Sequence, residues 1–583
     1  MHYDVVICGG GLAGLCVARQ LRREVPNASV AVVERVPRPL PEATHKVGES
    51  HVELSSHYLG MVLDLHDHLE NDHLKKNGLR FLCGDSSGPI AARPEIGPAE
   101  FPLVPSYQVD RGRLENFLRA ENEAAGVTLY EGERVLDIEL GEPHEIRLKD
   151  TTLTARWVLD ASGRQRIIQK KLGLRRPSPV QASAAWFRVE DRVLIGELVP
   201  EADREWHARD IENTRWLSTV HMMGRGYWVW IIPLASGFTS IGVVANTDTH
   251  DFNAFNTPER FRAWLKKHEP LLAERVAGVE LADFGVRRDY SYLSERVMSA
   301  DRWACLGEAG FFLDPLYSLG NDFLSMANCF SVRAIADDLR GELDPELLEE
   351  LHAILMMLAR DSSRTLSGNS RIFGDVNVLG AKVWWDFFNY WGFSCAFFFS
   401  EIWRQDLATL RAFRAMGQRW FDLNTHAQRV VEAWASLGTP TMPRKPFVAM
   451  PAPRTVLAEQ HGSLLEKRDP AATLAKMERD WQVGADLVTE LLAQALRDVG
   501  AEGAAALGEA LDLGRAWSLP LRSERITAEE LPRRKRLDML PTVARDLERA
   551  IGRPQTSETL AHLLELAGRP GTGSLPDPVR SAI

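Results

Sequence analysis

The chain has 583 residues, of which 45% are hydrophobic and 26% charged, the composition of an ordinary globular protein. The formal net charge of −11 argues against a large cationic surface for nucleic acid. The six cysteines form no CxxC pair and no metal-ligand spacing. We therefore expect a reducing, cytoplasmic environment, no disulfide framework and no metal site.

The N-terminal segment predicts a dinucleotide site. An apolar strand at residues 3–7 leads into a G-x-G-x-x-G loop and a helix, an arrangement that lets a pyrophosphate approach the backbone at the helix N-terminus. The next strand ends in an acid, which suits a hydrogen bond to a ribose hydroxyl. The residues assigned to this part of the site are Gly9, Gly11, Leu12, Ala13, Gly14, Glu34 and Arg35.

Two later strands also run into glycine turns, at Asp160-Ala-Ser-Gly and at Gly307-Glu308-Ala-Gly. Three such turns in one chain imply a long ligand, and their order resembles the FAD-containing aromatic hydroxylase superfamily. The resemblance implies FAD, with the last turn near the ribityl chain and isoalloxazine. The usual acid at the last turn is aspartate, whereas this chain has Glu308. No second G-x-G-x-x-G loop for a nicotinamide cofactor is present. The flavin must therefore take hydride from transiently bound NAD(P)H or be reduced by a partner flavin reductase.

Residues 183–190, 216–221, 227–233 and 239–245 alternate as expected for a mixed substrate-side sheet. In the stretch "GYWVWIIPL", alternation places Trp228, Trp230 and Ile232 on one face, and Pro233 ends the strand. A face of this kind is usual in a hydrophobic core, so the pattern alone leaves core packing as an alternative to a functional wall.

Two motifs narrow the chemistry: W-x-W-x-I-P at 228–233 and F-x-x-P-x-x-S-x-G at 312–320, together with "KVGES" at 46–50 and "KKNGLRF" at 75–81. With them the chain resembles a flavin-dependent halogenase of the tryptophan-halogenase superfamily over roughly residues 1–340. The expected fold is α/β: an FAD-binding GR2-type Rossmann-like domain with a mixed substrate-side sheet, plus a mainly α-helical C-terminal region.

The resemblance implies a reaction divided between two places. FADH2 and O2 give a flavin hydroperoxide, chloride or bromide converts it to hypohalous acid, and a lysine holds or carries the halogen beside the substrate. Lys76 is the expected lysine, with Lys75 as the alternative. The remaining assignments are Glu49 and Ser318 as catalytic residues; Gln108, Arg111, Asp160, Gly307, Glu308, Pro315 and Gly320 as flavin-binding residues; Leu319 and Gly320 as the halide site; and Trp228, Trp230, Ile232 and Pro233 as the partition between flavin and substrate.

Departures from the family pattern suggest the substrate class. Free-tryptophan halogenases carry a glutamate before the motif serine, where this chain has Tyr317. An aromatic residue there resembles the branch that acts on phenols and pyrroles, free or bound to a carrier protein. The continuation "NDFLS" at 321–325 differs from that branch. A flavin-dependent monooxygenase or oxidase of the same fold that uses no halide is therefore the alternative, and a non-enzymatic flavoprotein is a third reading.

The C-terminal part of the chain is expected to be helical, with long amphipathic segments at 343–361 and 401–436. The predicted divisions are a core at 1–340, a helical aromatic-rich substrate-side region at 341–438, a Pro-rich link at 439–454, a helical region at 455–567 and a disordered tail at 568–583.

The aromatic-rich stretch 383–403 is interrupted by charged and polar residues, so it predicts a buried helix pair, a pocket lining or a partner surface rather than a membrane span. The N-terminus shows no basic segment or cleavage site, so no signal peptide is expected.

Overall fold

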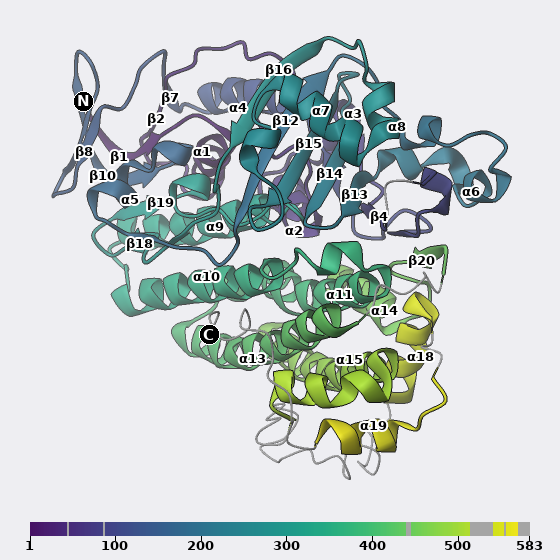
Figure 1. Cartoon of the computed structure of the whole chain (residues 1–583). Coiled ribbons are helices and arrows are strands. Elements are labelled where there is room, and N and C mark those ends of the chain that lie inside the picture. Colours follow the sequence, from purple (N-terminus) through teal and green to yellow (C-terminus); the bar gives the residue numbers. More distant parts are fainter. Residues whose placement is uncertain (44–45, 85–87, 439–444, 514–539, 553–555, 569–583) are drawn as a thin grey trace.

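The computed structural model describes residues 1–43, 46–84, 88–438, 445–513, 540–552 and 556–568 (Figure 1). Two eight-stranded sheets form one part of the molecule, and a stack of long helices forms the other. The predicted α/β class with a mainly helical C-terminal region is confirmed.

The first sheet has the strand order β18-β19-β10-β1-β2-β7, in which β19, β10, β1, β2 and β7 run parallel. Its central strands are apolar because helices cover them. Parallel pairing brings the carboxyl ends of these strands to one edge, and the three predicted glycine turns follow those ends. The strands are β1 (His2–Cys8), β2 (Val30–Glu34), β7 (Thr128–Glu131), β10 (Thr152–Asp160), β18 (Met298–Ser299) and β19 (Trp303–Cys305), with β8 (Asp137–Glu139) and β9 (His144–Arg147) alongside β10.

The second sheet has the order β16-β12-β15-β14-β13-β4-β5-β20 and is mixed, because β13 pairs with β4 in parallel while β14 pairs with β13 and β15 antiparallel. Its strands are β4 (Leu79–Leu82), β5 (Glu95–Gly97), β12 (Ala182–Val189), β13 (Thr219–Gly224), β14 (Tyr227–Pro233), β15 (Thr239–Asn246), β16 (Leu281–Arg287) and β20 (Phe447–Ala449). The short pairs β3 (Leu74–Lys75) with β6 (Tyr107–Gln108) and β11 (Arg175–Arg176) with β17 (Leu293–Ser294) lie outside both sheets.

Alternation along β14 is as predicted. Trp228, Trp230 and Ile232 belong to the larger hydrophobic cluster, whereas Val229 and Ile231 belong to the separate cluster on the other face.

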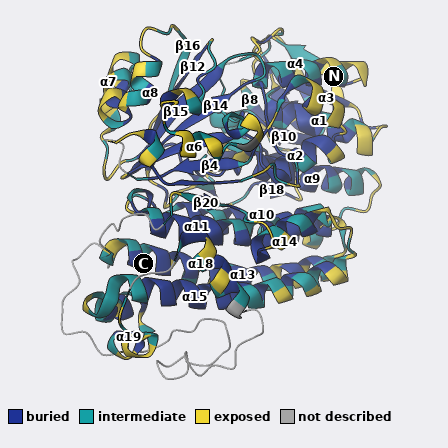
Figure 2. Cartoon of the chain, turned by 90° about the vertical axis from the view of Figure 1, so that its right-hand side faces the viewer, coloured by how far each residue is buried: buried dark blue, intermediate teal, exposed yellow. Residues whose placement is uncertain are grey.

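The helices divide between the two parts. Those around the sheets are α1 (Leu12–Glu24), α2 (Glu53–His57), α3 (His66–Asp72), α4 (Arg111–Ala124), α5 (Ile167–Lys171), α6 (Arg204–Ala208), α7 (Pro258–His268), α8 (Pro270–Arg275) and α9 (Gly320–Leu339). The stack contains α10 (Pro345–Leu366), α11 (Val376–Asn389), α12 (Ala396–Phe399), α13 (Leu407–Leu437), α14 (Val456–Gly462), α15 (Pro470–Leu511), α18 (Leu540–Ile551) and α19 (Leu560–Ala567). Helix α13 packs between α10 and α15, and the facing surfaces are buried (Figure 2).

The aromatic-rich stretch becomes the end of α11, a π-helical turn at Tyr390–Cys395 and α12. None of the described helices has both the length and the apolar character needed to cross a bilayer.

The predicted Pro-rich link contributes to the second sheet, because β20 pairs in parallel with β5. Residues 439–444 of that link and residues 569–583 of the predicted tail lie outside the described residues. The predicted boundary at residue 340 falls between α9 and α10.

Candidate active site

A cavity of about 730 Å³ runs along the carboxyl edge of the first sheet and beneath β14. Its walls include most of the residues predicted to bind the flavin or to act beside it. Those that line it are Gly9, Gly11, Leu12, Ala13, Glu34, Arg35, Glu49, Arg111, Trp228, Trp230, Ile232, Gly307, Glu308, Pro315, Ser318, Leu319 and Gly320.

The glycines at the first turn meet three different requirements. A Cβ on Gly9 would lie 2.3 Å from the carbonyl oxygen of Ala161, and a Cβ on Gly14 would lie 1.9 Å from the carbonyl oxygen of Gly9. A Cβ on Gly11 would meet nothing within 4 Å. Gly11 therefore faces open space directly before α1, whose N-terminus has no side-chain cap. An uncapped helix start facing an open cavity suits a pyrophosphate.

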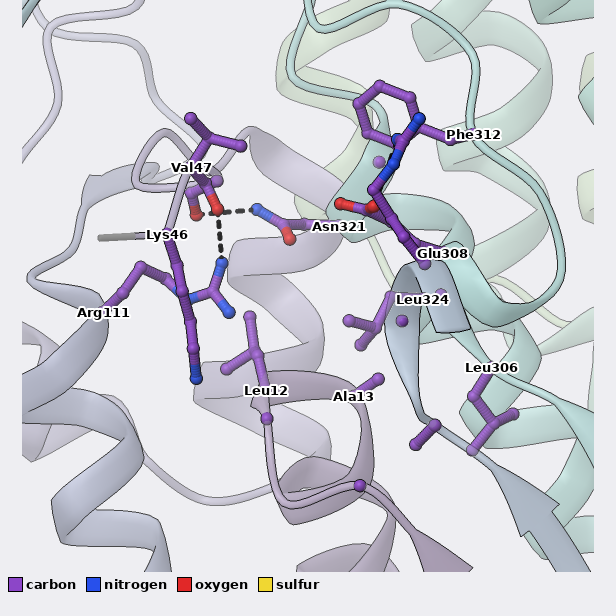
Figure 3. Close-up of a pocket in the computed structure, with 18 of the residues that line it drawn as sticks. Leu12, Ala13, Lys46, Val47, Arg111, Leu306, Glu308, Phe312, Asn321 and Leu324 are labelled. Carbon is purple, nitrogen blue, oxygen red and sulfur yellow. Dashed lines mark hydrogen bonds and ion pairs between the residues drawn. The ribbon is translucent and has the colours of Figure 1, made fainter. Parts of the chain in front are cut away.

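The other walls also fit FAD. Figure 3 shows Arg111 and Val47 on one side of the cavity, Glu308 and Phe312 on the other, and Leu12 and Ala13 below. Arg111 donates to the carbonyl oxygen of Val47 at 2.7 Å, which fixes the loop at 46–50.

Two acids at the cavity are engaged by protein groups. The carboxylate of Glu34 accepts hydrogen bonds from the amides of Gly10 and Val36, so it is fixed at the end of β2. Glu308, which replaces the usual aspartate, forms an ion pair with Arg164 at 3.3 Å.

Replacing Gly9 by alanine is expected to prevent flavin binding. The backbone at Gly9 has φ +124°, which L side chains rarely adopt, and the neighbouring carbonyl cannot yield cheaply. The purified Gly9→Ala variant should lack the visible flavin absorbance of the wild type. Gly196→Ala is the matched control, because a Cβ there would meet nothing within 4 Å. Wild-type flavin content in Gly9→Ala would contradict this account.

The turn before α9 forms a small anion-binding geometry. Ser318 has φ +62° and Leu319 has φ −68°, and successive residues of opposite φ direct neighbouring amides toward one point. Helix α9 begins at Gly320 without a side-chain cap, and Leu319 and Gly320 line the cavity.

The indoles lie on the flavin side of the site. The ring centres of Trp228 and Trp230 are 5.7 Å apart. The ring centre of His221 lies 5.1 Å from that of Trp228 and 4.8 Å from that of Phe81. Burial lowers the pKa of His221 to about 3, so this imidazole is neutral.

Lys76 lines a second, smaller cavity, of about 60 Å³. Its side chain is 1% exposed, and its Nζ donates to Ser50 Oγ at 2.8 Å and to the carbonyl oxygen of His51 at 3.1 Å. Burial lowers the pKa of Lys76 to about 7, although Glu53 and Asp322 oppose the shift. Lys75, by contrast, is exposed.

A chain of hydroxyls connects the two cavities. Ser50 lines the first cavity, and its Oγ contacts Lys76 Nζ, Thr219 Oγ1 at 2.9 Å and Ser318 Oγ at 2.9 Å. Leu319 lines both cavities. The partition predicted at Trp228, Trp230, Ile232 and Pro233 stays a prediction. Neither indole lines the second cavity, and Ser50 and Leu319 lie at the boundary between the two cavities.

Besides Lys76, four predicted residues do not line the first cavity. Gly14 packs against Gly9, and Asp160 accepts from the amides of Ser162 and Ile168, so both shape the turns from behind. Gln108 donates to the carbonyl oxygen of Leu217, and Pro233 ends β14. Their predicted roles at the flavin or at the partition stay predictions, because none of the four lines the cavity.

The sequence interpretation missed the helical side of the second cavity. Asp361, Asp386 and Asn389 line it, the last two within the stretch 383–403 that was considered as a pocket lining. Polar residues in an otherwise aromatic run were the available signal. No such signal marked Asp361 in the sequence, because this residue lies in an ordinary amphipathic helix.

Comparison with known proteins gives consistent matches. The sequence profile of the tryptophan halogenase family matches residues 90–349. Flavin-dependent halogenase chlA of Dictyostelium discoideum is 24% identical over 427 residues, covering 66% of this chain and 69% of the relative. The 1H-pyrrole-2-carbonyl-[peptidyl-carrier protein] chlorinase of Pseudomonas fluorescens is 28% identical over 344 residues, covering 54% and 72%.

Among solved structures, halogenase PltM in complex with phloroglucinol and FAD matches with a TM-score of 0.63 at 18% identity, covering 82% of this chain and 96% of that one. This similarity establishes the shared fold. Taken with the family profile, the curated relatives and a cavity whose walls fit FAD, it leads to one conclusion: the chain is similar to the flavin-dependent halogenases of the tryptophan halogenase family.

Proposed function

We propose that this enzyme halogenates an electron-rich aromatic ring, a phenol or a pyrrole, in the second cavity, and that Lys76 delivers the halogen. The observation that carries the proposal is the position of Lys76: a fully buried amine that lines a cavity separate from the one that fits FAD, yet contacts Ser50 on the wall of that first cavity.

When bound, reduced FAD with O2 and a halide ion supplies hypohalous acid. The protein's contribution is to hold the halide and to keep water and substrate away. The amides of Leu319 and Gly320 offer an anion site, and Trp228, Trp230 and Ile232 give that region an apolar wall. We assign Glu49 to the same cavity as a buried acid paired with Arg188.

Lys76 would then accept the halogen on its neutral amine. Hypohalous acid transfers its halogen to the Lys76 nitrogen while the amine proton leaves with the hydroxide as water. The electron-rich ring next takes the halogen, loses a ring proton and returns the amine. The other possibility is that charged Lys76 donates a hydrogen bond to hypohalous acid. A pKa of about 7 makes both forms available near neutrality.

The pH dependence of the product yield distinguishes these roles. Because the folded-state pKa of Lys76 is about 7, its neutral form increases as the pH rises through that value. We expect halogenated product per flavin oxidised to rise with a midpoint of about pH 7. Lys76→Arg, which stays charged, should show no such rise. A yield that instead falls through this range would assign the hydrogen-bonding role to Lys76.

The relatives and the sequence support the proposed substrate class and partners. Two relatives act on a pyrrole carried by a peptidyl carrier protein, so a carrier-bound ring belongs in any substrate panel. The sequence has one G-x-G-x-x-G loop, which favours a separate flavin reductase as the source of FADH2.

Mass spectrometry of products tests the proposal. Purified protein is given FAD, a flavin reductase, NADH, O2 and bromide, with phenols, pyrroles, indoles and carrier-bound aromatic acyl groups as substrates. A product with the equal-intensity isotope doublet of one bromine supports halogenation. Gain of oxygen or loss of hydrogen, independent of bromide, would replace it by the monooxygenase or oxidase alternative.

A further inference from the structure

The second cavity has a polar wall, which we define as Asp361 on α10 with Asp386 and Asn389 on α11. The three side chains are 3%, 5% and 6% exposed. They face the cavity from the helical part of the molecule, whereas Lys76 lies on the loop between β3 and β4. The two sides of the cavity therefore come from different layers of the fold.

Asp386 is electrically balanced by the protein. Its carboxylate forms an ion pair with Lys382 at 3.0 Å and accepts hydrogen bonds from Tyr317 at 2.7 Å and Gln428 at 2.8 Å. These contacts account for a buried acid at this place and fix the side chain of Tyr317.

Asp361 is held only by neutral groups in the contacts described here. Its two carboxylate oxygens accept from the amides of Asn389 and Asn424, each at 2.8 Å. Burial raises the pKa of Asp361 to about 6, so it is mostly a carboxylate above neutral pH. Asp361 therefore contributes hydrogen-bond acceptors to the wall, and neither of the contacts above pairs it with a cation.

Two polar atoms at the same wall have no partner among the described residues. They are Asn389 Oδ1, an acceptor, and the indole Nε1 of Trp391, a donor. Trp391 is 4% exposed and also lines the cavity. Since the Nδ2 atom of Asn389 is occupied by Asp361, its oxygen is the group left over. A buried unpaired polar atom is costly, and a bound ligand is a usual way to satisfy one.

The size of the cavity limits what enters it. A volume of about 60 Å³ corresponds to roughly five water-sized positions, the room for one small ring. Besides Lys76, the ionisable side chains on its walls include Glu53, Asp361 and Asp386. A substrate that brought its own carboxylate would add a negative charge to a buried acidic surface.

We propose that the polar wall, with Asn389 as its specificity-determining residue, binds a hydrogen-bond donor on a neutral single aromatic ring and holds that ring opposite Lys76. The inference rests on the proposed function, because it takes the second cavity as the substrate site. It goes further in requiring a free hydroxyl or ring N–H on the side remote from Lys76, and in excluding rings that carry a carboxylate.

Equilibrium binding tests this without turnover. The probes are resorcinol, 1,3-dimethoxybenzene and 3,5-dihydroxybenzoate, followed by quenching of tryptophan fluorescence in the flavin-loaded Lys76→Ala protein. We expect resorcinol to bind about tenfold or more tighter than the dimethyl ether, which keeps the ring but loses both donors. The benzoate should bind at least as poorly as the ether. Equal affinity for resorcinol and its ether would overturn the inference, and this comparison needs no variant of the wall.

Variants of the wall localise the effect. Asn389→Ala should lose most of the preference for resorcinol over its ether, and Asn389→Ser serves if the alanine variant fails to fold. Ser362→Ala is the matched control, since Ser362 lines the same cavity next to Asp361. Preference unchanged in both Asn389 variants would remove Asn389 from recognition.

The two proposals fail differently. If resorcinol binds with the expected preference but wild-type protein yields no halogenated product, the proposed reaction fails and the recognition wall stands. If product forms equally from resorcinol and its ether, the reaction stands and the wall does not select.

Discussion

Replacing Lys76 by alanine should abolish halogenation while leaving flavin oxidation intact. Lys76 lines the second cavity and does not line the first, so its removal leaves the walls that fit FAD unchanged. Loss of a positioned reacting side chain costs about a hundredfold to ten-thousandfold in rate. The measurements are brominated product by mass spectrometry and flavin oxidation by absorbance, in the same reaction.

Lys75→Ala is the control for this result. Lys75 is the adjacent residue, carries the same charge and is exposed, with its Nζ 6.0 Å from the ring of Phe101. Its removal should leave both rates at the wild-type level. A Lys76→Ala protein that still brominates, or a Lys75→Ala protein that does not, would move the reacting amine away from Lys76.

Replacing Arg188 by methionine should cause a large loss of stability. Arg188 is fully buried on β12 and forms ion pairs with Glu49 at 2.5 Å and with Asp283. Removing one partner of a buried pair costs about 3–5 kcal/mol, because the other charge stays buried without compensation. Urea denaturation at about pH 8 should show this decrease in the free energy of unfolding.

A second substitution gives a further check, because Arg188→Met leaves Glu49 buried without its cation. Adding Glu49→Gln should recover part of the loss at pH 8.

Arg288→Met provides the matched control for this stability measurement. Arg288 and Asp289 are paired at 3.5 Å, but both side chains are about two-thirds exposed. A surface pair of this kind contributes at most about 1 kcal/mol. A loss for Arg188→Met no larger than that of Arg288→Met would show that the buried pair is not needed for stability.

The sequence predicted those features that depend on local pattern. Glycine spacing between a strand and a helix identified the turn at Gly9, and period-two alternation placed Trp228 and Trp230 on one face of β14. The mixed second sheet and the helical C-terminal region were also predicted correctly. Each of these follows from side-chain geometry within a few residues.

Features that depend on distant packing were not predicted. The hydrogen bonds of Gln108 and Asp160 to backbone groups of Leu217 and Ser162 could not be read from the sequence. Nor did a local pattern point to Ser50 at the boundary between the cavities, where Lys76, Thr219 and Ser318 converge on it from separate segments. Contacts between segments that are distant in the chain cannot be predicted from a local sequence pattern.

The strand β20 positions part of the wall of the second cavity. It pairs with β5, and Met450 and Pro451, which follow it directly, line the second cavity. Because Met450 and Pro451 form part of that wall, a fragment ending before β20 would keep the residues that line the flavin cavity but would leave the second cavity open. Under the function proposed above, such a fragment would release hypohalous acid instead of using it, and exposed methionines such as Met61 would be oxidised to sulfoxides.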